Sequence, residues 1–136
     1  MIGDGLSSSI KETGIDYDYI VSPEPGGNQW GVLVSYLVGK RLNVLRATDM
    51  PGSVLSIERR SVYSSGRLYF KGIKPNDNVI IVDDVISSGN TLKSILEGLN
   101  HLGCRVSLVQ VIAVNGEEYK RTLKDYSVPV KYLIKT

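Results

Sequence analysis

The chain has 136 residues, a length that fits one domain with a modest hydrophobic core. Its 42% hydrophobic and 22% charged residues are typical of a soluble globular protein, and a net charge of +2 without long basic runs argues against nucleic-acid binding. No apolar stretch approaches membrane-spanning length, and the lone Cys104 excludes an internal disulfide. We therefore expect a cytoplasmic protein that binds neither a membrane nor nucleic acid.

The first third of the chain predicts alternating strands and helices after a polar start. Residues 1–16 are rich in Gly and Ser, so they are either poorly ordered or contain a short helix over residues 6–12. The next elements are predicted as a strand over 17–22, a loop with two prolines and two glycines over 23–28, a helix over 30–38 ended by Gly39, and a strand over 42–45.

The segment over residues 47–72 interrupts this alternation. It contains a Met-Pro-Gly break at residues 50–52 and two β-like runs, over residues 54–57 and 67–70. Two short β-like runs separated by a polar turn are typical of a hairpin. We predict a β-hairpin here that acts as a mobile flap and lies outside the core.

The rest of the chain completes an α/β pattern. We predict a strand over 79–82, a helix from residue 92, a strand over 105–114, a short helix over 117–124 and a last strand over 130–134. Strands that alternate with helices are typical of a parallel sheet. The predicted fold is therefore a single α/β domain over residues 1–136, with a parallel-core sheet flanked by helices and a β-hairpin flap.

The most informative residues follow the predicted strand over 79–82. Its four β-branched residues indicate a strand buried on both faces, and unpaired carboxylates are too costly to lie in such a core. Asp83 and Asp84 are therefore expected in the crevice at the carboxyl edge of the sheet, where open α/β sheets bind ligands. A small, hydroxyl-rich turn then opens a helix, whose unpaired N–H groups attract phosphate. These parts together predict a phosphosugar site.

Two other classes of protein place an acidic pair after a strand. A nucleotide-binding domain would need a Gly-x-x-x-x-Gly-Lys-Ser/Thr loop before the strand, and the chain has none. A response-regulator receiver would place its acidic pair near the start of the chain, whereas here most of the sheet precedes it. The chain therefore lacks the sequence feature that each of these two classes requires.

Residues 79–91 resemble the thirteen-residue phosphoribosyl pyrophosphate motif of the type I phosphoribosyltransferases, in which an apolar strand leads to two acidic residues and a Thr-Gly-Gly-Thr-like loop. The resemblance implies that Asp83 and Asp84 are catalytic residues that hold the ribose hydroxyls. Asn90 replaces the second Gly of the loop, which requires a helical or an Asn-compatible left-handed backbone. The implied 5-phosphate loop consists of Ser87, Ser88, Gly89, Asn90 and Thr91.

The loop over residues 23–28 carries the second part of the resemblance. It joins a strand to a helix, as the 87–91 loop does, so both loops should open at the same edge of the sheet. Its glycine pair resembles the one that many family members use to bind pyrophosphate. Glu24 would repel pyrophosphate unless magnesium or a neighbouring base intervenes. The implied pyrophosphate contacts are Pro25, Gly26, Gly27, Asn28, Arg46, Arg59 and Arg60.

The middle of the chain resembles the purine branch of the family, which includes adenine phosphoribosyltransferases and archaeal hypoxanthine/guanine relatives. Arg46 and the Met-Pro-Gly at 50–52 resemble their Arg-Lys and Leu-Pro-Gly segments, although Ala47 replaces the Lys. Val62 stands where adenine-type members often have Glu, which favours another purine or reduced activity. The predicted base-pocket residues are Val85, Val114 and Asn115.

The resemblance implies an enzyme that transfers the 5-phosphoribosyl group from phosphoribosyl pyrophosphate to a purine base and releases pyrophosphate. Its implied cofactor is Mg²⁺, held through substrate oxygens and water rather than by direct protein ligands, and its implied assembly is a homodimer. Two alternatives stay open. The departures at Glu24, Ala47 and Val62 favour a non-catalytic regulator that binds phosphoribosyl metabolites. The second alternative is an orotate phosphoribosyltransferase, and the Met-Pro-Gly segment argues against it.

Overall fold

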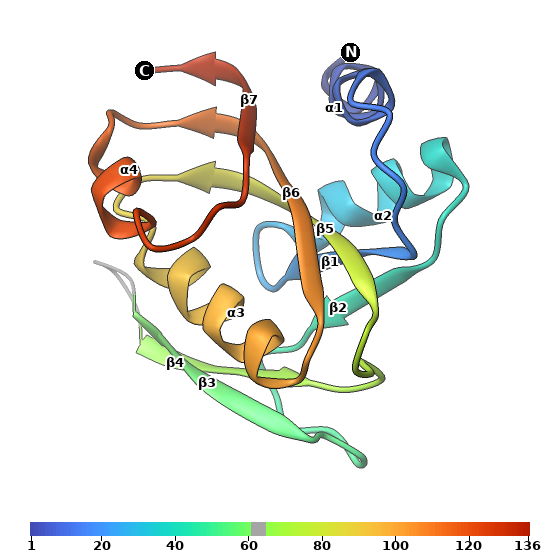
Figure 1. Ribbon diagram of the computed structural model, residues 1–136, viewed down its shortest axis with the longest axis vertical. Coiled ribbons are helices and arrows are strands. Elements are labelled where there is room, and N and C mark those ends of the chain that lie inside the picture. Colours follow the sequence, from blue (N-terminus) through green and yellow to red (C-terminus); the bar gives the residue numbers. More distant parts are fainter. Residues whose placement is uncertain (61–64) are drawn as a thin grey trace.

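The computed structural model describes the backbone of residues 1–60 and 65–136 and the side chains of residues 1–59 and 66–136. A five-stranded parallel sheet forms its centre, in the order β2-β1-β5-β6-β7, and β3 and β4 form a separate antiparallel hairpin (Figure 1). The elements are α1 (Ile2–Glu12), β1 (Tyr19–Pro23), α2 (Asn28–Val38), β2 (Leu42–Leu45), β3 (Leu55–Arg60), β4 (Ser65–Phe70), β5 (Asn78–Ile86), α3 (Asn90–His101), β6 (Arg105–Val114), α4 (Glu118–Thr122) and β7 (Val130–Lys135).

The central strand β5 contributes side chains to two hydrophobic cores, one on each face of the sheet. Val79 and Ile81 pack in the core that contains the buried residues of α3, whereas Ile80 and Val82 pack with α1 and α2. All four side chains are fully buried, because successive residues of a strand point to opposite faces. The prediction of a parallel α/β sheet with a strand buried on both faces is confirmed.

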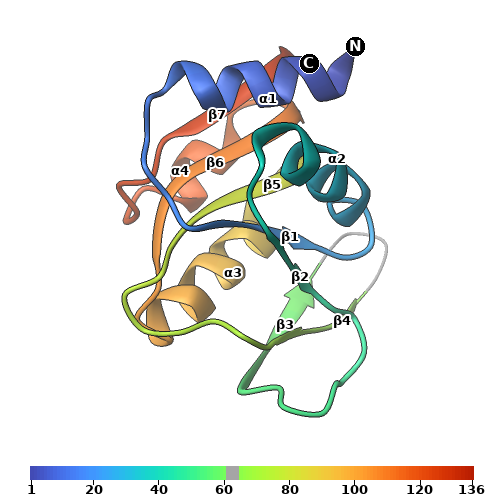
Figure 2. The same cartoon turned by 90° about the vertical axis from the view of Figure 1, so that its right-hand side faces the viewer.

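The base of the hairpin is part of the core. Figures 1 and 2 show α3 between the central sheet and the hairpin. Leu68 and Phe70 of β4 are fully buried in the same core as the apolar face of α3. Gly98 of α3 makes room for them, since a Cβ there would lie 2.8 Å from Phe70 Cζ. The predicted hairpin is confirmed, but the expectation that residues 47–72 lie outside the core is wrong for its base.

Two predicted boundaries near the acidic pair also differ. β5 does not end at Val82 but continues to Ile86, because β6 pairs with it along this stretch, including Asp83 with Val111. α3 begins at Asn90, two residues earlier than predicted, so Asn90 has the helical backbone that its replacement of Gly requires.

The polar amino-terminal segment forms the helix α1. Leu6 and Ile10 pack in the core on the α2 side of the sheet. Gly3 and Gly5 allow α1 to approach its neighbours closely, since a Cβ on Gly5 would lie 3.1 Å from the Leu133 side chain in β7. Across residues 1–60 and 65–136, no helix has the length and apolar character that crossing a membrane requires.

Candidate active site

A pocket of about 340 Å³ opens at the carboxyl edge of the sheet. Three segments form its walls: the end of β5 with the β5–α3 loop, the loop after β1, and β3 of the hairpin. Open parallel sheets bind their ligands at this edge. The lining residues are Pro23, Glu24, Pro25, Gly26, Arg59, Asp83, Asp84, Val85, Ile86, Ser87, Ser88, Gly89, Asn90, Thr91 and Leu92.

The acidic pair lies in the last part of β5, half-buried at the wall of the pocket. Asp83 Oδ1 accepts the backbone N–H of Asp84 at 2.8 Å, and Asp84 Oδ1 accepts that of Val85 at 2.7 Å. Burial, and then the neighbouring Asp84 carboxylate, raise the pKa of Asp83 well above its ordinary value, while the Arg59 guanidinium acts in the opposite direction. Carboxylates in such a position are suited to accept hydrogen bonds from sugar hydroxyls.

The β5–α3 loop brings backbone N–H groups to the pocket at the start of α3. Gly89 precedes this helix with φ +87°, and a Cβ there would lie 3.3 Å from a backbone atom of α4, so both conformation and space favour glycine. Ser88 Oγ accepts the Asn90 N–H at 3.2 Å, and Asn115 Nδ2 donates to Ser87 Oγ at 3.1 Å. A glycine turn that opens a helix is typical of a phosphate site.

The glycine pair of the loop after β1 lies directly against the acidic pair. A Cβ on Gly26 would lie 2.9 Å from Asp84 Cγ, and one on Gly27 would lie 2.6 Å from Asp83 Oδ1. These positions need glycine for close approach, since Gly27 has an ordinary φ of −80°. The loop after β1 is therefore packed against the end of β5, and residues of this loop and of the 87–91 loop line the same pocket.

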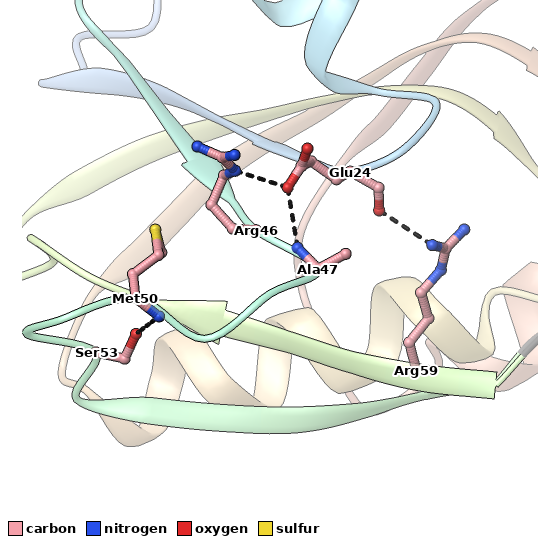
Figure 3. A network of polar contacts seen from close by, with 6 residues as sticks. All are labelled: Glu24, Arg46, Ala47, Met50, Ser53 and Arg59. Carbon is pink, nitrogen blue, oxygen red and sulfur yellow. Dashed lines mark hydrogen bonds and ion pairs between the residues drawn. The ribbon is translucent and has the colours of Figure 1, made fainter.

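Glu24 connects the loop after β1 with the end of β2 (Figure 3). Its Oε1 accepts the Arg46 Nε–H at 2.7 Å and the Ala47 N–H at 2.9 Å. The hydrogen bond from Ala47, and then that from Arg46, lower the pKa of Glu24, so the carboxylate is charged at neutral pH and is offset by a guanidinium. The basic Arg46 side chain therefore accompanies this carboxylate. A neighbouring basic group was one of the two conditions, with magnesium, under which Glu24 would not repel pyrophosphate.

The predicted arginines occupy different positions around Glu24. Arg59 lines the pocket, and its Nη1 donates to the Glu24 carbonyl oxygen at 3.1 Å. Arg46 approaches Glu24 from the other side and is half-exposed, away from the pocket lining formed by the described residues (Figure 3). The side chain of Arg60 and the whole of Val62 lie outside the described residues.

The remaining predicted residues are distributed around the pocket. Val85 lines it with an exposed side chain, and Asn115 reaches it through Ser87. Val114 is fully buried in the hydrophobic core, so its side chain does not face the pocket. Asn28 is the first residue of α2.

Sequence reasoning made the effect of Glu24 on pyrophosphate depend on magnesium or a neighbouring basic group, and the structure places the Arg46 guanidinium beside it. The register of the sheet explains its actual partners. Pro23 of β1 lies opposite Leu45 of β2, so the next residues, Glu24 and Arg46, become neighbours. An acidic residue directly after one strand and an arginine directly after the neighbouring parallel strand would have suggested the pair, because the two residues lie at the same edge of the sheet.

The fold and the pocket define the class of protein before any comparison. A parallel α/β sheet with a phosphate loop and a carboxylate pair at its carboxyl edge is a phosphosugar-binding α/β domain. The phosphoribosyl transferase domain family matches residues 1–133, and the chain belongs to this family.

Relatives and solved structures agree with this assignment. The chain is 35% identical to the hypoxanthine/guanine phosphoribosyltransferase of Methanohalobium evestigatum, over 93% of this chain and 66% of the relative. It is 32% identical to the enzyme of the same name from Aciduliprofundum boonei, over 100% and 72%. The adenine phosphoribosyl transferase of Trypanosoma brucei, solved with AMP, pyrophosphate and ribose-5-phosphate, has the same fold, with a TM-score of 0.83, 18% identity and coverage of 98% and 62%. The chain spans about two thirds of the length of the curated relatives it matches.

Proposed function

We propose that this protein is a purine phosphoribosyltransferase, which transfers the 5-phosphoribosyl group from phosphoribosyl pyrophosphate to a purine base and releases pyrophosphate. One observation carries the proposal: a single pocket has the acidic pair and the phosphate loop on one wall and the glycine loop with Arg59 on the other. Relatives named for hypoxanthine, guanine and adenine support a purine acceptor.

The three parts of the substrate correspond to three parts of the pocket. The 5-phosphate binds at the start of α3, where Ser87, Gly89 and Thr91 surround backbone N–H groups. The ribose hydroxyls donate to Asp83 and Asp84. The pyrophosphate binds at residues 24–27 beside the hairpin arginine, and the base binds on the open side next to Val85.

Catalysis follows from the charges that develop during transfer. Breaking the bond between ribose C1 and pyrophosphate builds positive charge on the sugar and negative charge on the leaving group. The ionised acidic pair stabilises the sugar, and the Arg59 guanidinium stabilises the leaving group. This arrangement needs Asp83 to be deprotonated, and because its pKa is raised, turnover should fall as the pH is lowered towards that value.

The donor set of the pocket fits Mg²⁺ as a cofactor. Asp83 and Asp84 present carboxylate oxygens, the ligands that this ion prefers, next to the proposed pyrophosphate site. Within the described residues, no group of three or more His, Cys, Asp or Glu side chains converges as a metal cage. Mg²⁺ would therefore be held through substrate oxygens and water beside the acidic pair, and the bound ion would neutralise charge on the leaving pyrophosphate.

We also propose that the protein acts in the cytoplasm as a homodimer. The lone cysteine is buried and reduced, which suits a reducing compartment. On α2, Val32 and Tyr36 are 59% and 83% exposed, and such apolar side chains support contact with a second copy. Light scattering coupled to size exclusion would measure the mass, and a monomer at micromolar concentration would contradict the dimer.

The function is tested by incubating the protein with Mg²⁺, phosphoribosyl pyrophosphate and, separately, adenine, hypoxanthine, guanine and orotate. We expect a nucleoside monophosphate and pyrophosphate in equal amounts with at least one purine. Product from orotate alone would contradict the purine assignment. Binding of phosphoribosyl pyrophosphate without product from any base would instead indicate a regulator that keeps the substrate site and lacks the reaction.

A further inference from the structure

Glu24 contacts two arginines with two different groups. Its carboxylate accepts the Arg46 Nε–H at 2.7 Å and the Ala47 N–H at 2.9 Å, while its backbone carbonyl accepts Arg59 Nη1 at 3.1 Å. Figure 3 shows the two guanidinium groups approaching Glu24 from opposite sides. One residue in the loop after β1 is thus joined both to the end of β2 and to the hairpin.

Both connections lead to the hairpin. Arg59 is a residue of β3 itself. Arg46 forms an antiparallel bridge with Tyr69 of β4, in which the Tyr69 N–H donates to the Arg46 carbonyl at 2.9 Å and the Arg46 N–H to the Tyr69 carbonyl at 3.3 Å. Each strand of the hairpin is therefore linked to Glu24, one through a side chain and the other through the backbone of Arg46.

The charges around Glu24 separate the roles of the two arginines. The Glu24 carboxylate offsets Arg46, which lies away from the described pocket lining, whereas Arg59 lines the pocket and donates to the neutral Glu24 carbonyl. A guanidinium carries five N–H donors, more than one carbonyl oxygen takes up. The contact with Glu24 therefore fixes the direction of one Arg59 donor without neutralising the guanidinium.

We infer that Glu24 is a positioning residue for the pyrophosphate half of the pocket: by joining the loop after β1 to both hairpin strands, it places Arg59 opposite the acidic pair. This inference rests on the proposed function, because pyrophosphate is the group that Arg59 would meet. It goes beyond the expectation from sequence, in which a neighbouring basic group would only prevent Glu24 from repelling pyrophosphate. The Glu24 carboxylate is held by Arg46 and Ala47, so Glu24 acts through Arg46 and Arg59.

A purely structural role predicts a different pattern of effects. The Glu24 and Arg46 side chains are 24% and 49% exposed, and ion pairs with this exposure contribute little to folding stability. The hairpin base is held independently by Leu68 and Phe70 against α3. Removing the Glu24 carboxylate should therefore leave the fold nearly intact. It releases the loop after β1 from Arg46 and Ala47, and the carbonyl that directs Arg59 should shift with the loop.

Binding measurements on the whole 136-residue chain test the inference. Calorimetry with Mg²⁺ would compare Glu24→Ala, Glu24→Gln and the unchanged protein, with phosphoribosyl pyrophosphate and inorganic pyrophosphate as ligands. We expect Glu24→Ala to weaken both ligands roughly tenfold or more, because a small displacement of a positioned group is enough for such a loss. Glu24→Gln keeps an oxygen acceptor for the Ala47 N–H, so it should recover part of the affinity. Glu12→Gln, an exposed change at the end of α1, is the matched control and should bind as the unchanged protein does.

Two further readouts separate positioning from stability. The KM for the purine base should change less than twofold in Glu24→Ala, and the melting temperature should change little. In a double-mutant cycle, Arg46→Ala should add little to the effect of Glu24→Ala if both act through one contact. Unchanged pyrophosphate affinity, or equal losses for the purine and for phosphoribosyl pyrophosphate, would overturn the inference.

The outcome for Glu24 is distinct from that for the proposed function. If the unchanged protein binds phosphoribosyl pyrophosphate but forms no nucleotide, the transferase activity is contradicted while the calorimetric comparison still decides the role of Glu24. If the unchanged protein binds neither phosphoribosyl pyrophosphate nor pyrophosphate, both proposals are overturned.

Discussion

The two walls of the pocket are built in different ways. The wall that would hold the ribose and the 5-phosphate comes from consecutive residues, Asp83 to Thr91, at the junction of β5 and α3. The opposite wall combines the loop after β1, the end of β2 and a hairpin strand, which polar contacts between Glu24, Arg46 and Arg59 hold together. The first wall is local in sequence, whereas the second exists only once the sheet and hairpin have formed.

This difference has consequences for how each wall responds to change. A local wall is carried by the helix and strand that flank it, so altering one of its side chains removes chemistry and leaves geometry in place. An assembled wall depends on contacts between distant segments, so altering one contact moves the others.

Removing both charges from the local wall should have the largest effect on activity. We expect Asp83→Asn combined with Asp84→Asn to lower kcat/KM at least ~1000-fold, because the groups that face the electron-poor sugar lose their charge. The fold should persist, since amides have the size of the carboxylates they replace. Steady-state kinetics and circular dichroism measure the two results. Unchanged turnover in a folded double variant would show that the acidic pair is not catalytic.

Truncating the support of the assembled wall should have the largest effect on stability. Phe70 is fully buried beside α3, and we expect Phe70→Ala to lower the free energy of unfolding by about 3–5 kcal/mol. Val54→Ala, at a residue 60% exposed just before β3, should change it little. Urea unfolding measures both. Equal, small changes in the two variants would mean that the hairpin base does not belong to the core.

The contact between the two walls should be sensitive to single methyl groups. A Cβ on Gly26 or Gly27 would collide with the carboxylate of Asp84 or Asp83, so we expect either Gly→Ala change to lower kcat/KM ~100-fold through displacement of an acid. Gly66→Ala in β4 is the control, because a Cβ there would have no described atom within 4 Å. If Gly26→Ala and Gly27→Ala behave like the control, the walls are not packed as the structure has them.

The same contrast explains what could be predicted from the sequence. The strand, the acidic pair and the phosphate loop are contiguous, so the local wall was predicted residue by residue. The pairing of Glu24 with Arg46 depends on the register between β1 and β2, which residue types alone do not determine. The buried base of the hairpin was missed for a related reason. A short run of alternating apolar and polar residues, such as the one around Leu68 and Phe70, occurs both in exposed hairpins and in hairpins packed on a helix. The pattern therefore does not predict which of the two is present.

Removing Arg59, the cation of the assembled wall, should change how kcat/KM depends on pH through Asp83 of the local wall. Arg59 lowers the pKa of Asp83, against burial and Asp84, which raise it. Arg59→Gln should therefore raise that pKa further, so the fall in kcat/KM on the acidic side should move to higher pH. The affinity for pyrophosphate should also drop roughly tenfold. A pH profile that keeps its acidic side unchanged would show that the two walls are not electrostatically coupled.

The smallest expected effect is on the stability of the ligand-free protein. The pKa of Asp83 is raised in the folded state, so folding favours its protonated form, and this contribution is present at low pH and lost as the pH rises through the folded-state value. At pH 8 the charged group opposes folding, and Asp83→Asn should raise the melting temperature by about 2–4 °C. Near pH 3, where the wild-type carboxyl is also neutral in the unfolded chain, the difference should disappear. Asp49→Asn, at an exposed residue, is the control for a general charge effect. A less stable Asp83→Asn variant at pH 8 would mean that this carboxylate supports the fold, and the local wall would then combine structure and chemistry in one residue.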